Sequence, residues 1–131
     1  MVELISDGIH IHESVVRATF KLFPDRVVLI SDSMRAAGVA DGTYDLGGQE
    51  VTVSGKLATL ADGTIAGSVT NLYDCMRTAV SFGIPAEEAI AAATINPAKS
   101  IGIYDQVGSL TPGKKADILL VDKELNLIRV I

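Results

Sequence analysis

The chain has 131 residues, of which 48% are hydrophobic and 21% are charged, and these values are ordinary for one compact globular unit. The formal net charge is -5, with acidic and basic residues interspersed, so we expect no nucleic-acid partner. Cys75 is the single cysteine, which excludes an intrachain disulfide and gives no sign of an oxidising compartment. No apolar run approaches the roughly 20 residues that cross a bilayer, so we expect a cytoplasmic protein without a membrane partner.

The first 30 residues predict two strands of a parallel sheet. Residues 2–5 form a short apolar run, and Val15, Val16 and Phe20 predict a helix from about residue 12 to residue 22. Residues 26–30 form a continuous aliphatic run, which is typical of a strand buried on both faces of a parallel sheet. Strand, helix and strand in this order form the repeating unit of a (β/α)8 barrel, which takes about 250 residues, so we expect only part of one.

The rest of the chain predicts a small β excursion, three helices and a final pair of strands. Residues 42–46, 49–53 and 57–60 alternate apolar and polar side chains between glycine-containing turns. Helical spacing or helix-start signals predict helices over residues 69–82, 85–93 and 96–102, the last with Asn96 as N-cap. Strands are predicted within residues 116–121 and 125–131, and we place a domain boundary near Tyr104.

Two histidines and one aspartate are candidates for chemistry. His10 and His12 form an H-x-H pair that would project from one face of an extended segment, as in a metal site. Against this interpretation, zinc needs three or four protein ligands and the chain has no other histidine. Asp32 follows an apolar strand, where barrel enzymes carry functional residues, but a turn aspartate is an equal alternative.

The glycine-containing segment 63–68 precedes the most regular predicted helix. Its backbone N–H groups could receive an anion such as a sugar phosphate, and the alternative is a simple turn with Ser68 as N-cap. Cys75 lies inside that helix with no histidine near it in sequence, so we interpret it as a core residue and not as a nucleophile.

Several motifs occur together in an order and spacing that resemble one enzyme family. They are S-D-G-I-H at residues 6–10, S-D-S-M-R-A-A-G at 31–38, L-G-G at 46–48, G-T-I-A-G-S at 63–68, N-P-A at 96–98 and G-S-L-T-P-G-K-K-A-D at 108–117. With them the chain resembles the N-acetylglucosamine-6-phosphate deacetylases of the amidohydrolase superfamily over essentially its whole length. The motifs at residues 6–10 and 31–38 point to the deacetylase, whereas the last motif specifies only the superfamily.

The resemblance implies an α/β fold with two parts. Residues 1–104 would be the C-terminal portion of the (β/α)8 metal-dependent hydrolase barrel, including its last two strands, and residues 105–131 would add strands to a small β-sandwich domain. The implied activity is hydrolysis of N-acetylglucosamine 6-phosphate, an amino-sugar phosphate, to glucosamine 6-phosphate and acetate. The intact enzyme would need a divalent metal, zinc or similar, whose ligands in the family lie on earlier strands, so we expect this chain to be inactive alone.

The resemblance also assigns roles to individual residues. Asp32 matches the catalytic general base and acid, which takes a proton from the attacking water and passes it to the leaving amine. His10 would hydrogen-bond the reacting amide or a neighbouring oxygen, and His12 matches nothing functional. The remaining positions that match substrate-binding segments are Asp7, Gly8, Ile9, Ile65, Ala66 and Gly67.

Two alternatives to this assignment remain. The chain could belong to another amidohydrolase that acts on a cyclic amide or a different amide, because the closing motif does not discriminate among them. It could also be a non-catalytic assembly module. An incomplete barrel leaves strand edges uncovered, so we expect a homo-oligomer.

Overall fold

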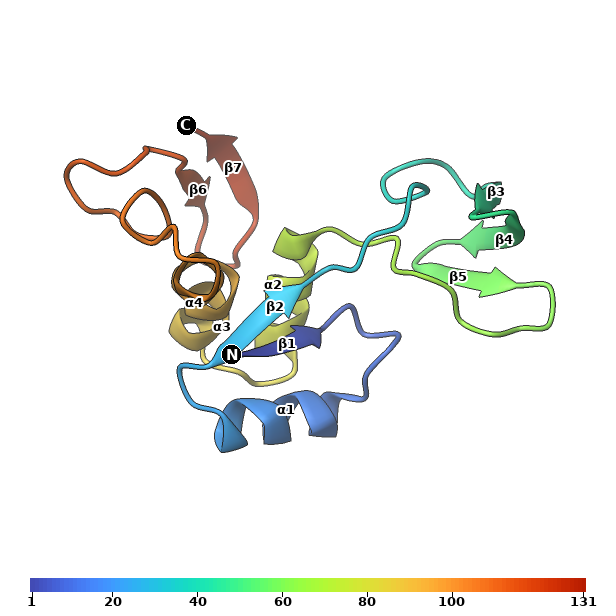
Figure 1. The fold of residues 1–131 in the computed structure, drawn as a ribbon, viewed down its shortest axis with the longest axis horizontal. Coiled ribbons are helices and arrows are strands. Elements are labelled where there is room, and N and C mark those ends of the chain that lie inside the picture. Colours follow the sequence, from blue (N-terminus) through green and yellow to red (C-terminus); the bar gives the residue numbers. More distant parts are fainter.

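The structure, a computed structural model, describes residues 1–131 and has a mixed α/β fold whose elements form three groups (Figure 1). A parallel strand pair and four helices make the largest group. A three-stranded sheet stands to one side of it and a two-stranded hairpin to the other, near the C-terminus (Figure 1). None of the helices combines the length and the apolar character needed to span a membrane.

The parallel pair consists of β1 (Val2–Ile5) and β2 (Val27–Ile30), which run in register from Val2 beside Val27 to Ile5 beside Ile30. Parallel strands need a crossover connection, and α1 (Glu13–Leu22) supplies it. The predicted order of strand, helix and strand is therefore confirmed, with bounds that differ by one residue. Both strands end at the same edge of the sheet, since they run in the same direction.

The main core lies between this pair and the helices. The three further helices are α2 (Leu72–Ser81), α3 (Ala86–Ala93) and α4 (Ile95–Ser100). On α3 the buried residues are both alanines, Ala89 and Ala92, whose small side chains let the helix backbone approach its neighbours closely. The buried residues of this main core are Leu4, Val16, Phe20, Val27, Leu29, Met76, Ala79, Ile84, Ala89 and Ala92.

Two predicted helix starts are wrong. The helix predicted from residue 69 begins at Leu72, with Asn71 as N-cap, because Ser68 pairs with Ser33 in an isolated parallel bridge. The last helix begins at Ile95, and Asn96 lies inside it. The side chain of Asn96 is buried and donates from Nδ2 to the Val27 carbonyl oxygen at 2.8 Å, so it ties α4 to β2 and does not cap the helix.

The predicted β excursion is confirmed as an antiparallel meander of β3 (Gly42–Leu46), β4 (Gln49–Ser54) and β5 (Leu57–Leu60). One face of this sheet is buried over a second, smaller core of Met34, Ala36, Val51, Val53 and Ala58. Because the core includes residues from the segment after β2, the meander packs against that segment. It thereby supports the backbone that follows the second parallel strand.

The C-terminal hairpin consists of β6 (Leu119–Val121) and β7 (Leu127–Val130), both shorter than predicted. Its apolar side chains are largely solvent-exposed on both strands, with Ile128 62% and Val130 61% exposed. The connecting turn is anchored to the main group, because Leu125 packs beside the main core and its carbonyl oxygen accepts a hydrogen bond from the Tyr73 hydroxyl at 2.7 Å.

Candidate functional site

The candidate site lies at the edge where β1 and β2 end. Ser6 and Asp7 follow β1, and Ser31 and Asp32 follow β2, so the parallel register brings both segments to the same edge. Ser6 is fully buried, and its hydroxyl donates to the Cys75 carbonyl oxygen on α2 at 2.7 Å. This bond fixes the chain where it leaves β1, one residue before the first of the candidate side chains.

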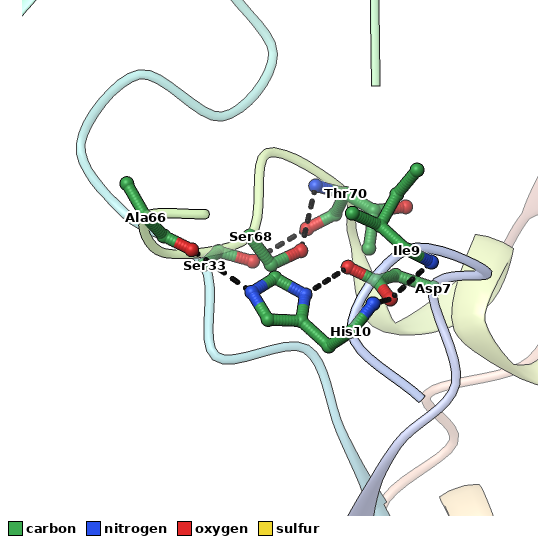
Figure 2. Close-up of polar contacts among 7 residues, drawn as sticks. All are labelled: Asp7, Ile9, His10, Ser33, Ala66, Ser68 and Thr70. Carbon is green, nitrogen blue, oxygen red and sulfur yellow. Dashed lines mark hydrogen bonds and ion pairs between the residues drawn. The ribbon is translucent and has the colours of Figure 1, made fainter. Parts of the chain in front are cut away.

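Asp7 and His10 form the most tightly organised pair of the site (Figure 2). Oδ1 of Asp7 accepts hydrogen bonds from the backbone N–H groups of Ile9 at 3.0 Å and His10 at 3.1 Å. Oδ2 of Asp7 lies 2.7 Å from Nδ1 of His10. The Asp7 side chain is 3% exposed and that of His10 is 21% exposed, so the pair is shielded without being sealed from solvent.

The other ring nitrogen of His10 reaches a distant segment of the chain. Nε2 of His10 lies 2.9 Å from the carbonyl oxygen of Ala66, 56 residues away in sequence. Figure 2 shows the imidazole between Asp7 on one side and Ala66 on the other. The structure thus brings together the segments at residues 6–10 and 65–67, which the sequence assigned to one site on resemblance alone.

The same distant segment holds the backbone around Asp32. The Ser68 N–H donates to the Asp32 carbonyl oxygen at 3.2 Å, and the Met34 N–H donates to the Ser68 carbonyl oxygen at 2.8 Å. The Ser33 hydroxyl adds a bond to the Thr70 carbonyl oxygen at 2.5 Å. Asp32 itself has φ = +49°, a left-handed conformation that non-glycine residues seldom adopt and that surrounding contacts must hold in place.

Burial, hydrogen bonds and nearby charges shift the pKa values of Asp7 and His10. Burial would raise the pKa of Asp7, but the hydrogen bonds from Ile9 and His10 outweigh it and lower the pKa of this carboxyl. Burial would likewise lower the pKa of His10. The Ala66 carbonyl, the Asp7 carboxylate and the charge of Asp32 outweigh it and raise the pKa of the imidazole. The charge of Asp32 thus acts on the pKa of His10 in the same direction as that of Asp7.

The remaining predicted site residues lie around this centre with different exposures. Gly8 is exposed and has φ = +84°, and Ile9 is half-buried with its N–H held by Asp7. Ile65 is 44% exposed and forms an isolated bridge with Thr59 of β5. A Cβ atom on Gly67 would stand 3.2 Å from that of Met34, so a side chain there would require a neighbour in the segment after Asp32 to shift by a few tenths of an ångström.

Three other candidates receive structural explanations. His12 is the N-cap of α1, where its Nδ1 accepts from the Ser14 N–H at 3.2 Å, so the H-x-H pair does not converge on a common site. Cys75 is fully buried, and burial raises the pKa of its thiol to about 11, which agrees with a core role. In segment 63–68, the N–H groups of Thr64, Ala66 and Ser68 already donate within the chain, which leaves few for an anion.

Two polar residues of the site have a structural role that the sequence did not indicate, although Ser68 belongs to the motif at residues 63–68 and was a candidate N-cap. Ser68 and Thr70 are buried, and Oγ of Ser68 accepts from the Thr70 N–H at 3.1 Å. Both belong to the segment that holds the backbone of Asp32 and Ser33. Serine and threonine after a glycine are ordinary turn residues, so only their long-range partners distinguish them.

A metal was expected of the intact enzyme, and the residues present do not fit one. No group of three or more His, Cys, Asp or Glu side chains is placed to hold a metal ion. Both ring nitrogens of His10 are also already engaged by oxygen atoms of the chain. These side chains therefore do not form a metal site.

The chain matches one protein family and several curated relatives. The family model of the amidohydrolases matches residues 2–131. The chain is 42% identical over 133 residues to the N-acetylglucosamine-6-phosphate deacetylase of Bacillus subtilis (strain 168), covering 100% of this chain and 34% of that protein. It is 37% identical over 130 residues to the N-acetylgalactosamine-6-phosphate deacetylase of Escherichia coli O157:H7, covering 98% of this chain and 34% of that protein.

Solved structures of such enzymes resemble this one closely. N-acetylglucosamine-6-phosphate deacetylase from Thermotoga maritima matches with a TM-score of 0.89 and 34% identity, over 98% of this chain and 36% of that one. A mutant from Mycobacterium smegmatis, in complex with N-acetyl-D-glucosamine-6-phosphate, matches with a TM-score of 0.86 and 33% identity, over 100% and 36%. The chain spans about a third of the length of these relatives. It belongs to the amidohydrolase family and is homologous to the N-acetylglucosamine- and N-acetylgalactosamine-6-phosphate deacetylases.

Proposed function

We propose that these residues supply the proton-transfer group and part of the sugar site of an N-acetylglucosamine-6-phosphate deacetylase, acting within an intact enzyme. One observation supports the proposal: His10 and Asp32 follow neighbouring parallel strands at one edge of the sheet, and residues 66–68 bond to both, through the Ala66 carbonyl and the Ser68 N–H. Homology to deacetylases suggests that the reaction at this edge is the hydrolysis of an acetamide. Functional residues of barrel enzymes lie at such carboxyl-terminal strand ends.

The same proposal includes the architecture of the intact protein. Residues 1–104 are the C-terminal part of a (β/α)8 barrel, and residues 105–131 add strands to a β-sandwich domain. The parallel β1–β2 pair with its helical crossover supports the first part, and the largely exposed apolar hairpin β6–β7 supports the second. Such uncovered surface also supports a homo-oligomer, and we retain the cytoplasmic location expected from the sequence.

In the proposed reaction Asp32 transfers protons. Its carboxylate takes a proton from the water that attacks the acetamide carbonyl carbon, and then gives that proton to the amine nitrogen as the C–N bond breaks. Acetate and the free amino sugar phosphate leave. When substrate binds, Nε2–H of His10 would exchange its bond to the Ala66 carbonyl for one to an oxygen on which negative charge develops. Activation of the attacking water falls to other parts of the intact enzyme, because the side chains of this chain do not fit a metal site.

The substrate positions proposed in this chain are Asp7, Gly8, Ile9, His10, Ile65, Ala66 and Gly67. This set is supported by the contact between His10 and Ala66 and by the close approach of Gly67 to Met34, two residues after Asp32. A second candidate substrate is N-acetylgalactosamine 6-phosphate, because a relative with that activity is 37% identical to this chain.

A chimeric enzyme tests the proposal. This chain would replace the matching third of the Bacillus subtilis deacetylase, and acetate release would be followed with both hexosamine phosphates. We expect activity with at least one of them, and Asp32→Asn should lower kcat by roughly 100-fold to 10,000-fold, the usual contribution of a general base. The substrate with the higher kcat/KM decides between the two candidates.

The matched control is Asp105→Asn, because Asp105 is also an exposed aspartate but lies far along the chain, before the C-terminal hairpin. It should leave kcat within about twofold of the parent chimera, as expected of a surface substitution. Full activity of the Asp32→Asn chimera would show that Asp32 is not the proton-transfer residue. A folded chimera that releases acetate from neither substrate would contradict the proposed function itself.

A further inference from the structure

Both ring nitrogens of His10 face oxygen atoms that accept hydrogen bonds. Nδ1 lies 2.7 Å from a carboxylate oxygen of Asp7, and Nε2 lies 2.9 Å from the carbonyl oxygen of Ala66 (Figure 2). A neutral imidazole has one donor nitrogen and one acceptor nitrogen, so it can satisfy only one of these partners. The carbonyl of Ala66 can only accept, which requires a proton on Nε2.

The proton between Nδ1 and Asp7 belongs on the imidazole. Oδ1 of Asp7 already accepts two backbone N–H groups, from Ile9 and His10, and such bonds favour the ionised carboxylate. A carboxylic acid is also intrinsically far more acidic than an imidazolium. With Asp7 ionised, Nδ1 must be the donor. The geometry therefore requires a proton on each ring nitrogen.

The charges around His10 favour the same state. Asp7 from the loop after β1 and Asp32 from the end of β2 are both acidic, and the segment of residues 65–68 presents only the polar carbonyl of Ala66. The coupled directions of the pKa values agree with an ion pair, lowered for Asp7 and raised for His10. Asp7 is the closer acid, and its side chain is almost fully buried, where water screens the attraction least.

We propose that Asp7 is a positioning residue, which acts through His10 by holding it as a doubly protonated imidazolium bonded to Asp7 and to the carbonyl of Ala66. Both oxygens of its carboxylate are engaged within the chain, by the N–H groups of Ile9 and His10 and by the His10 ring. Asp7 fixes the ring orientation at Nδ1 and so directs Nε2–H toward residues 65–68. The protonation state stands on the geometry alone, whereas its catalytic consequence rests on the proposed deacetylase function.

A doubly protonated His10 would have a different catalytic role from Asp32. An imidazolium has no lone pair on either nitrogen, so His10 can donate a hydrogen bond but cannot act as a general base. Proton abstraction from water is then left to Asp32. Once a substrate oxygen replaces the Ala66 carbonyl at Nε2–H, a cationic donor interacts more strongly with the negative charge that this oxygen gains than a neutral donor does. Loss of Asp7 would convert His10 to a neutral ring and weaken this interaction.

The two histidines of the chain make the protonation state directly measurable. ¹H–¹⁵N spectra of the imidazole nitrogens of His10 and His12 would be recorded across a pH titration of the 131-residue chain. We expect His10 to keep protons on both nitrogens above pH 6.5, the ordinary midpoint of a histidine. In Asp7→Asn the midpoint of His10 should fall, while the signals of His12, which bonds to Ser14, stay the same.

A midpoint of wild-type His10 at or below 6.5 would overturn the proposal, as would an unchanged midpoint in a folded Asp7→Asn variant. If that variant loses its dispersed amide spectrum, Asp32→Asn takes its place, because its exposed side chain can change without disturbing the core. It should lower the midpoint of His10 by removing the second acid, and Asp105→Asn should leave it where it is. No shift in Asp32→Asn would then contradict the electrostatic argument.

The catalytic consequence has a separate readout in the chimeric enzyme. Asp7→Asn should move the alkaline limb of the kcat/KM profile to lower pH, because His10 then loses its second proton earlier, whereas a purely structural loss would lower activity equally at every pH. If the chimera is inactive, the deacetylase function fails but the titration of His10 still stands. If the titration fails while the chimera is active, only the role of Asp7 is wrong.

Discussion

Replacing Asn96 by alanine tests whether one buried side chain links α4 to β2. In a parallel pair, alternate residues of a strand direct their backbone groups to the same neighbour. The N–H of Val2 on β1 donates to the carbonyl of Arg26, so the backbone groups of the next residue, Val27, point to the opposite edge of β2. There the carbonyl of Val27 receives Nδ2 of Asn96 at 2.8 Å.

The expected cost follows from the burial of both partners. Asn96 is 6% exposed and Val27 is 2% exposed, so water cannot readily replace the lost donor. A buried carbonyl left without a partner costs about 1–3 kcal/mol, and Asn96→Ala should therefore lower the free energy of unfolding by about 2 kcal/mol. Asn96→Asp should cost more, about 3 kcal/mol or above, because it places a carboxylate against the same carbonyl in a buried site.

Urea unfolding followed by circular dichroism measures both differences from the shift in midpoint at constant slope. The matched control is Asn126→Ala, an exposed asparagine in the turn of the C-terminal hairpin, which should change the free energy of unfolding by no more than about 0.5 kcal/mol. The reasoning fails if Asn96→Ala is as stable as the control. It also fails if Asn96→Asp is more stable than Asn96→Ala near neutral pH.

Two further predictions concern local packing and pH. Gly108 has φ = +88°, and a Cβ there would stand 2.8 Å from that of Ala98, so Gly108→Ala should cost about 3 kcal/mol. Gly102→Ala is its control, since Gly102 has φ = +74° with open space around it, and it should cost only about 1 kcal/mol in the same urea experiment. Equal costs would show that the clash is relieved by movement of the loop. For pH, the lowered pKa of Asp7 adds stability above its ordinary value of 3.8, which is lost as the pH falls through the folded value. The raised pKa of His10 adds stability below 6.5, which is lost as the pH rises through the folded value. The stability difference between wild type and Asp7→Asn should therefore be largest between pH 3.8 and 6.5, and a difference that is constant across the titration would contradict the ion pair.

The strands and the order of elements could be predicted because each carries a local signal. A continuous aliphatic run, as before Asp32, indicates a strand that is buried on both faces. Alternating apolar and polar residues, as in β4, indicate a strand that is buried on one face. The helix starts could not be placed in the same way. Asn96 has the residue type of an N-cap, but a buried bond to Val27 competes for its side chain, and that partner lies 69 residues away.

The candidate site, too, could be predicted from the sequence only in part. The residue types and spacing of the motifs at residues 6–10 and 31–38 were sufficient to suggest an enzyme family, and the comparisons bear that family out. Their roles in substrate binding and catalysis stay predictions. Spacing alone left His10 as one half of an H-x-H pair with a metal site as an alternative, and only the family resemblance separated a substrate role for His10 from His12.

What the sequence by itself determined is the set of patterns that follow the chain: the apolar periods and turn glycines, which are local, and the family motifs, whose order and spacing extend from residue 6 to residue 117. The tertiary structure decided which of those residues meet. His10 turns away from His12 toward Asp7 and Ala66, because the parallel pairing of β1 and β2 and the return of residues 65–68 bring an acid and a carbonyl to opposite sides of its ring. A proton count on an imidazole depends on both partners, and one of them lies 56 residues away.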